Sequence, residues 1–112
     1  MSGSDLGPDA RPLGPADVTV ANAPERLRYE LRLGDAVIGF ATYRLVGRRR
    51  VVFIHTEVDD GHSGQGLAER LAQFALDDVR AAGKRIVAVC PYIASYLRKH
   101  PEYDDIVDKR TG

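Results

Sequence analysis

The 112-residue sequence predicts an α+β domain in which a mixed, mostly antiparallel sheet carries helices on its faces. The first half of the chain alternates apolar and polar residues in short runs separated by turn signals, which is typical of an antiparallel meander. The second half has apolar residues at helical spacing, then a short apolar run, then a second helical segment. The predicted order of elements is therefore β-β-β-α-β-α, with the first helix crossing over to a parallel last strand.

The meander is predicted from three consecutive strands. Residues 25–33 (ERLRYELRL) alternate leucines and a tyrosine with charged residues, as in a half-buried strand. Gly34-Asp35 is a two-residue hairpin signal, and residues 36–46 (AVIGFATYRLV) return as the next strand. Gly39 within this strand indicates a bulge or a close approach of another backbone. A second turn leads into residues 51–58 (VVFIHTEV), the third strand.

The elements of the second half are predicted from a change of period. Apolar residues from Leu67 to Val79 form a helical stripe, and Gly83 is expected to end this helix in a left-handed conformation. Residues 85–90 (RIVAVC) are continuously apolar after the first, as expected for a strand buried on both faces. Residues 91–100 (PYIASYLRKH) are predicted to be helical, with proline at the favoured first position.

The start of the chain is predicted to stand apart from the domain. Residues 1–16 (MSGSDLGPDARPLGPA) hold too few apolar residues to fix a conformation, so we expect a disordered tail and a single domain over residues 17–112. Asp5 and Asp9 argue against a signal or transit peptide. Val18–Val20 is a candidate short edge strand preceding the meander.

Composition excludes several classes of protein. The 16 basic and 16 acidic residues balance, so no global field favours nucleic acid or anionic lipid, and no apolar stretch is long enough to span a bilayer. The single cysteine, Cys90, rules out an internal disulfide and fits a cytoplasmic protein. The three histidines His55, His62 and His100 are scattered, so no metal site is predicted. The oligomeric state is left open.

A glycine-rich loop, GHSGQGLA at residues 61–68, lies directly before the first predicted helix. Glycines let backbone N–H groups turn toward an anion, and a helix N-terminus adds a partial positive charge. Leu67 and Ala68 stand where a nucleotide triphosphatase needs Lys and Ser/Thr, which argues against phosphoryl transfer. Glu69 takes the third glycine position of a dinucleotide fingerprint. The pattern fits a pyrophosphate that is bound without being cleaved, as in coenzyme A; a turn without function is the alternative.

Three motifs lie in the second half of the chain: H-T-E-V at His55–Val58, G-x-G-x-A at Gly64–Ala68, and C-P-Y followed by K-H-P-E-Y at Cys90–Tyr92 and Lys99–Tyr103. The resemblance that they carry is to the small single-domain members of the GNAT acetyltransferase superfamily. It covers roughly residues 25–107. It implies a GNAT-like acetyl-CoA-binding domain and an N-acetyltransferase that acts on a small-molecule or peptide amine, whose identity does not carry over.

The resemblance also implies which residues contact the cofactor. The superfamily often begins the loop with Gln or Arg where this chain has Gly61, which leaves the backbone cradle intact. Lys99 and His100 close the second helix and can act on its dipole or on cofactor phosphates. The predicted contacts with acetyl-CoA are Val58, Gly64, Gln65, Gly66, Leu67, Ala68, Tyr92, Ser95 and Tyr96.

Cys90 is the first of three catalytic candidates. It directly precedes Pro91, so it is predicted to cap the second helix, where the helix N-terminus lowers the pKa of a thiol. Such a thiol can attack a thioester and form an acetyl-cysteine, or simply lie beside the acyl group. The alternative is a buried cysteine that packs as a small hydrophobe.

His55 and Glu57 are the other two candidates. Strand alternation places Phe53, His55 and Glu57 on one face, and the even-numbered residues 52–58 on the other. Direct transfer needs a base to take the proton of the amine, and either residue can serve. For Glu57 the alternative is a structural pair with an arginine.

Two tyrosines and two other classes of function complete the predictions. Tyr92 and Tyr96 share a helix face, where a tyrosine can protonate the departing thiolate or pack in the core. The alternatives to an enzyme are a non-catalytic acyl-CoA-binding module and a redox-active thiol protein. Turnover with acetyl-CoA supports the enzyme over the binding module. Ready oxidation of Cys90 is what the redox-active thiol protein predicts.

Overall fold

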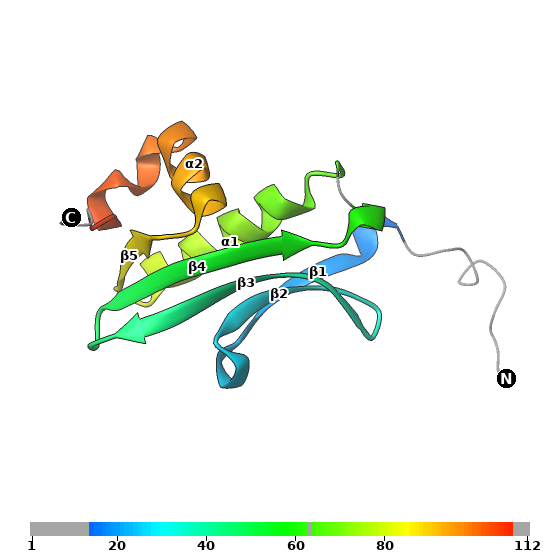
Figure 1. Cartoon of the computed structure of the whole chain (residues 1–112), viewed down its shortest axis with the longest axis horizontal. Coiled ribbons are helices and arrows are strands. Elements are labelled where there is room, and N and C mark those ends of the chain that lie inside the picture. The colour runs from blue at the N-terminus through cyan, green and yellow to red at the C-terminus, as the bar shows by residue number, and fades with distance from the viewer. Residues whose placement is uncertain (1–13, 63, 109–112) are drawn as a thin grey trace, which may run out of the picture.

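The computed structural model describes residues 14–62 and 64–108, and most of the predicted tail therefore lies outside the described residues. One sheet in the order β1-β2-β3-β4-β5 supports two helices (Figure 1). The predicted fold class is confirmed. The elements are β1 (Val18–Ala23), β2 (Arg28–Leu33), β3 (Ala36–Val46), β4 (Arg50–Val58), α1 (Leu67–Ala81), β5 (Arg85–Ala88) and α2 (Pro91–Lys99), with short 3-10 turns at Pro15–Asp17, Pro24–Arg26, Asp60–His62 and Pro101–Ile106.

The strand pairing follows the predicted meander and crossover. Strands β1 to β4 are antiparallel neighbours, and β5 pairs with β4 in parallel after the crossover through α1. The candidate edge strand at Val18–Val20 is longer than predicted, because β1 pairs with β2 along its six residues. Strand β2 begins only at Arg28, since Leu27 takes a left-handed conformation with φ 53° after the turn at Pro24–Arg26.

Helix α1 ends as its sequence predicts. Gly83 has φ 70°, and its amide donates to the carbonyl of Arg80 while the amide of Lys84 donates to that of Val79. These two bonds form a Schellman motif, which satisfies the last carbonyls of the helix. Strand β5 is shorter than the predicted 85–90, because the amides of Val89 and Cys90 both donate to the carbonyl of Phe53 before α2 begins.

Both helices lie on one face of the sheet, as Figure 1 shows. Their apolar residues share one core cluster with the inward side chains of the strands, and α1 contributes Leu67, Leu71, Ala72, Ala75, Leu76 and Val79. Residues paired directly across strands share a face. The other face, here called the open face, has no helix over it among the described residues and carries Arg28, Glu30, Arg32, Phe40, Thr42, His55 and Glu57.

A β-bulge in β4 overturns one sequence prediction. Tyr43 pairs with Phe53 but the preceding Thr42 pairs with His55, so Ile54 is an extra residue in β4. The extra residue breaks the alternation of faces. Phe53 is fully buried in the core, whereas His55 lies on the open face, so the two do not share a face as predicted.

Gly39 confirms the predicted close approach. It lies next to a second bulge, at Ile38, where the pairing of β2 with β3 shifts register. A Cβ atom at Gly39 would lie 2.8 Å from Cδ1 of Leu31 and 3.0 Å from the carbonyl oxygen of Glu57. Glycine therefore lets β3 lie close to the end of β4 that carries the candidate base.

Candidate active site

A cleft opens where β4 and β5 separate. The two strands pair from Arg50/Arg85 to Phe53/Ala88, after which β4 continues to Val58 and the chain turns into α2. The strands separate because β4 has a bulge at Ile54, and because the amides of Val89 and Cys90 both donate to the carbonyl of Phe53 instead of continuing the ladder. A cavity of about 330 Å³ lies at the end of the separated strands, lined by Val58, His62, Gly64, Gly66, Leu67, Ala68, Glu69, Tyr92 and Lys99.

The glycine-rich loop forms one wall of this cleft with its backbone. Gly64 and Gly66 have φ values of 78° and 72°, which side-chain-bearing residues rarely adopt. Gly66 is the N-cap of α1 and has no side chain to cap it. The first-turn amides of Leu67 and Ala68 and the positive end of the helix dipole therefore lie beside the cavity, an arrangement that favours an anion.

Most of the predicted cofactor contacts come together in the cleft, and some do not. Gln65 is exposed on the loop, and Ser95 does not line the cavity. Tyr96 is buried and stacks on His100 with ring centroids 4.0 Å apart. One helical turn separates it from Tyr92, and this turn carries it out of the cleft. The sequence reasoning missed His62 and Glu69; they flank the glycines of the loop, two residues before Gly64 and three residues after Gly66, which is the signal that could have found them.

Tyr92 is the tyrosine that lines the cleft. It is half-buried, and burial raises the pKa of its hydroxyl, with a smaller contribution from the negative charge of Glu69. A raised pKa keeps the hydroxyl protonated at neutral pH. Tyr92 is therefore available as a proton donor in the cleft.

Cys90 caps α2, as its position before Pro91 predicts. It is the N-cap residue of α2, is 2% exposed, and its Sγ lies 3.4 Å from Oγ1 of Thr56 on β4. Thr56 was given no role from the sequence. The contact places a thiol and a hydroxyl together on the helix-covered side of β4, where the strands diverge.

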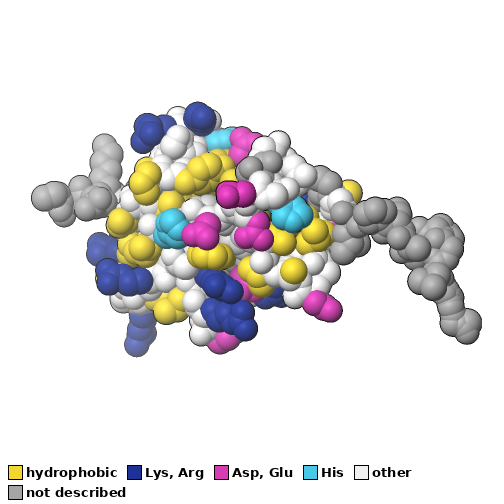
Figure 2. All heavy atoms as spheres, turned by 45° about the vertical axis from the view of Figure 1, so that its right-hand side comes forward, with side chains coloured by type: hydrophobic (Ala, Val, Ile, Leu, Met, Phe, Trp, Pro, Cys, Tyr) yellow, Lys and Arg dark blue, Asp and Glu magenta, His cyan; other side chains and the backbone are white. Residues whose placement is uncertain are grey.

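His55 and Glu57 lie on the opposite face of the same strand. Nε2 of His55 is 3.0 Å from Oε1 of Glu57, which confirms that the two are neighbours. Their side chains are 58% and 59% exposed, so both are accessible from the open face. On the side of the molecule that Figure 2 shows, histidine and acidic side chains lie beside one another, with Lys and Arg side chains below them.

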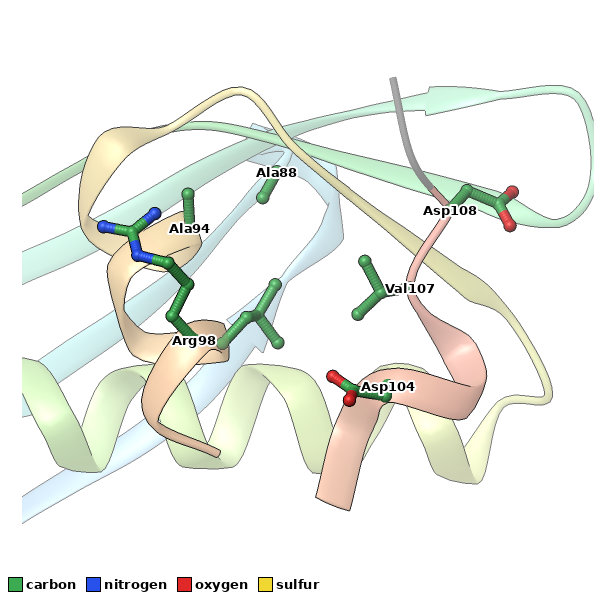
Figure 3. A pocket seen from close by; sticks show the side chains of 7 residues that line it. Ala88, Ala94, Arg98, Asp104, Val107 and Asp108 are labelled. Carbon is green, nitrogen blue, oxygen red and sulfur yellow. The ribbon is translucent and has the colours of Figure 1, made fainter. Parts of the chain in front are cut away.

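A second cavity, of about 340 Å³, lies at the other edge of β5 (Figure 3). Its apolar floor includes Ala88, Ala94 and Val107, and Arg98 and Asp104 stand at its rim. None of the predicted site residues lines it. It is therefore separate from the cleft between β4 and β5.

Neither a metal-binding cluster nor a membrane-spanning helix is found among the described residues. Within residues 14–62 and 64–108, no group of three or more His, Cys, Asp or Glu side chains is placed to hold a metal ion. No helix in the same part of the chain is long and apolar enough to cross a membrane.

The five-stranded sheet with two helices on one face defines the fold of this domain, and comparison with known proteins identifies the family. Residues 28–106 match the family model described as GCN5-related N-acetyl-transferase. The chain belongs to the GCN5-related N-acetyltransferase family, the GNAT superfamily that its motifs resemble. It is therefore an acetyltransferase by family, with acetyl-CoA as the donor typical of that family and an amine as acceptor.

Known relatives are similar to this chain in sequence, and solved structures are similar to it in fold. Protein NATD1 of Mus musculus is 34% identical over 85 residues, which cover 75% of this chain and 77% of that protein. Protein NATD1 of Homo sapiens is 41% identical over 59 residues, about half of each chain. A GCN5-like protein from Staphylococcus aureus has the same fold, with a TM-score of 0.65 at 21% identity over 86% of this chain and 93% of that one. Ribosomal-protein-alanine N-acetyltransferase from Brucella melitensis has a TM-score of 0.51 at 21% identity, covering 76% and 63% of the two chains.

Proposed function

We propose that this chain binds acetyl-CoA in the cleft between β4 and β5 and transfers the acetyl group directly to an amine presented on the open face. The separation of β4 from β5 after Phe53 carries this proposal. It places a helix N-terminus with a glycine cap at one end of the cleft and an exposed His55–Glu57 pair on the neighbouring face. We place the protein in the cytoplasm, because its one cysteine is free and a reducing compartment keeps it so.

The residues around the loop fit the pyrophosphate of coenzyme A. The amides of Leu67 and Ala68 would hold it with the helix dipole, and Lys99 at the rim supplies a positive charge. Gly64 and Gly66 keep this wall of the cleft free of side chains. Glu69 is the one acidic residue in the lining, and it favours a position for the phosphates nearer to Lys99.

The catalytic groups divide between the two faces of β4. In the reaction the amine nitrogen forms a bond to the acetyl carbon while the thioester C–S bond breaks. Glu57, aided by His55, takes the proton that the amine loses. Tyr92 donates a proton to the departing sulfur, because it lines the cleft and its hydroxyl is protonated at neutral pH. Cys90 and Thr56 lie beside the acyl group, and burial of the thiol supports direct transfer over a route through an acetyl-cysteine.

Calorimetric titration with coenzyme A tests the binding half of the proposal, with two matched glycine variants. Gly64→Glu and Gly83→Glu both place a glutamate at a φ of 70–78° with open space around the new Cβ. Each should lose about 1 kcal/mol of stability from the same backbone strain. Only Gly64→Glu adds a negative charge beside the cleft, so it should abolish binding while Gly83→Glu binds as the wild type does.

If the two variants bind coenzyme A with equal affinity, the loop is not part of the cofactor site.

Turnover of acetyl-CoA on a panel of amines tests the catalytic half of the proposal. Tight binding without turnover on that panel would favour a non-catalytic acyl-CoA-binding module. No thermal stabilisation by coenzyme A, together with ready oxidation of Cys90, would favour a redox-active thiol protein.

A further inference from the structure

The open face carries a group of arginines around one buried carboxylate. Glu30 on β2 is 2% exposed, and its Oε1 accepts hydrogen bonds from Nε and Nη2 of Arg32 at 3.0 and 2.8 Å. Its Oε2 accepts from Nε of Arg28 at 2.7 Å and from Nη1 of Arg26 at 3.5 Å. Three guanidinium groups share one carboxylate, so the group keeps an excess of two positive charges at the surface.

Arg28 is the member of this group that is held in place from two sides. Glu30 engages it through Nε alone, and its guanidinium carbon lies 4.9 Å from the centre of the Phe40 ring. Its side chain is 24% exposed, which is less than that of Arg26 or Arg32. A guanidinium fixed in this way has lost its side-chain freedom before any ligand arrives, so its remaining N–H donors can bind an anion at lower entropic cost.

The register places this arginine next to the candidate base. Arg28, Thr42 and His55 are directly paired across β2, β3 and β4, and so are Glu30, Phe40 and Glu57. The Arg28 guanidinium therefore lies over β3, between its own strand and the His55–Glu57 pair. Adjacent strands lie roughly 5 Å apart, so the anion-binding donors and the base are separated by roughly 5 to 10 Å.

We infer that the open face holds an anion subsite built on Arg28, and that the acceptor is an amine bearing a carboxylate or phosphate roughly 5 to 10 Å from its nitrogen. This inference rests on the proposed function. A positive end at Arg28 and Arg32 and a negative end at Glu57 match the two ends of such an acceptor. Its anion binds the guanidinium, and its amine is thereby placed beside the base.

Matched pairs of acceptors test the inference with the full chain and acetyl-CoA. δ-Aminovalerate is compared with its amide, and phosphoethanolamine with ethanolamine, so that the two sources of negative charge are tested separately. The wild type should use at least one anionic member with a kcat/KM about tenfold above that of its neutral twin, the range of one charged hydrogen-bonding pair. Arg28→Gln should remove this preference by raising KM for the anionic acceptor, and Arg28→Lys should restore part of it.

Two further measurements separate this subsite from general effects. Arg98→Gln removes one positive charge from an exposed position on α2 and should leave the preference unchanged. Titration of the protein with δ-aminovalerate in the absence of acetyl-CoA should shift the NMR signals of the Arg28 Nε–H and the Phe40 amide. Melting curves identify any variant that fails to fold. If Arg28→Gln fails, Arg28→Lys still tests the subsite, because lysine keeps a positive charge beside Glu30.

The outcomes distinguish failure of this inference from failure of the proposed function. Acetyl transfer at equal rates to anionic and neutral twins would overturn the subsite and leave the acetyltransferase proposal intact. An anion preference that persists in Arg28→Gln would place the subsite elsewhere and also overturn the inference. Absence of both transfer and coenzyme A binding would overturn the proposed function and this inference with it.

Discussion

Glu57 lies on the open face of the sheet and Cys90 lies on its helix-covered face, both near the point where β4 and β5 separate. They represent the two possible routes for the acetyl group. Glu57 is exposed on the open face beside His55, where an incoming amine has access to it. Cys90 is buried on the helix-covered side, and its thiol is held against Thr56. A general base must reach the amine, whereas a nucleophile must reach the thioester carbon. The accessible carboxylate favours direct transfer.

Two substitutions test this preference. Glu57→Gln keeps the size of the side chain but removes the base, so it should lower kcat about 100-fold or more with little change in the affinity for coenzyme A. Cys90→Ala should cost about 1 kcal/mol of stability and lower kcat less than tenfold. Steady-state kinetics measures both, and intact-mass spectra after treatment with acetyl-CoA should show no acetyl group on Cys90. The reverse pattern, with an acetylated Cys90, would establish the covalent route.

At the scale of elements, the contact of β3 with β4 at Gly39 positions the candidate base. An added Cβ would lie 3.0 Å from the Glu57 carbonyl oxygen and 2.8 Å from Cδ1 of Leu31, tighter than such contacts normally are. The leucine methyl can rotate away, but the backbone carbonyl moves only if β4 moves. The end of β4 that carries Glu57 therefore has little room to shift.

Gly39→Ala is accordingly expected to lower the free energy of unfolding by about 1–3 kcal/mol, the usual range for overpacking. Because the displaced atom belongs to the residue that carries the proposed base, kcat should fall as well. Urea unfolding followed by kinetics on the folded variant measures the two effects. A destabilised variant with unchanged kcat would show that the position of β4 at this contact does not matter for transfer.

The sequence predicts most elements because local chemistry determines them. The hairpin at Gly34-Asp35, the left-handed Gly83 and the start of α2 at Pro91 each depend on the backbone preference of one or two residues. These features were found because no distant partner is needed to form them.

The bulge at Ile54 was not predicted, because it is a property of strand pairing. Nothing in the residues VVFIHTEV interrupts their alternation, yet the register between β3 and β4 shifts by one residue at that point. This shift separates Phe53 from His55. The burial of Glu30 was missed for a related reason: the pattern R-Y-E-L-R indicates a charged strand face, but not that the arginines converge on the carboxylate.

For the whole molecule, carboxylates paired with arginine determine how stability depends on pH. Burial by itself would raise the pKa of Glu30, but the hydrogen bonds and charges of Arg28 and Arg32 outweigh it and hold the pKa below its ordinary value. Arg80 lowers the pKa of Asp105, and Arg85 and Arg50 lower that of Asp108. A group whose pKa is lower in the folded protein stabilises it above the unfolded-state pKa, and this contribution is lost as the pH falls through the folded-state pKa.

Glu30→Gln should therefore be less stable than the wild type at neutral pH and should lose less stability in acid. We expect a cost of about 2 kcal/mol at pH 7, below the usual range for breaking a fully buried ion pair because Arg28 and Arg32 remain partly in contact with water. Below about pH 4.3, the ordinary pKa of a glutamate, the difference should shrink as the wild-type carboxylate takes up a proton. Urea unfolding at a series of pH values measures the two curves.

Glu25→Gln, which changes an exposed glutamate just before β2, is the matched control and should follow the wild type. If the curves of wild type and Glu30→Gln stay parallel down to about pH 3, the arginine group does not stabilise the ionised form of Glu30, because a stabilised carboxylate must lose that advantage on protonation.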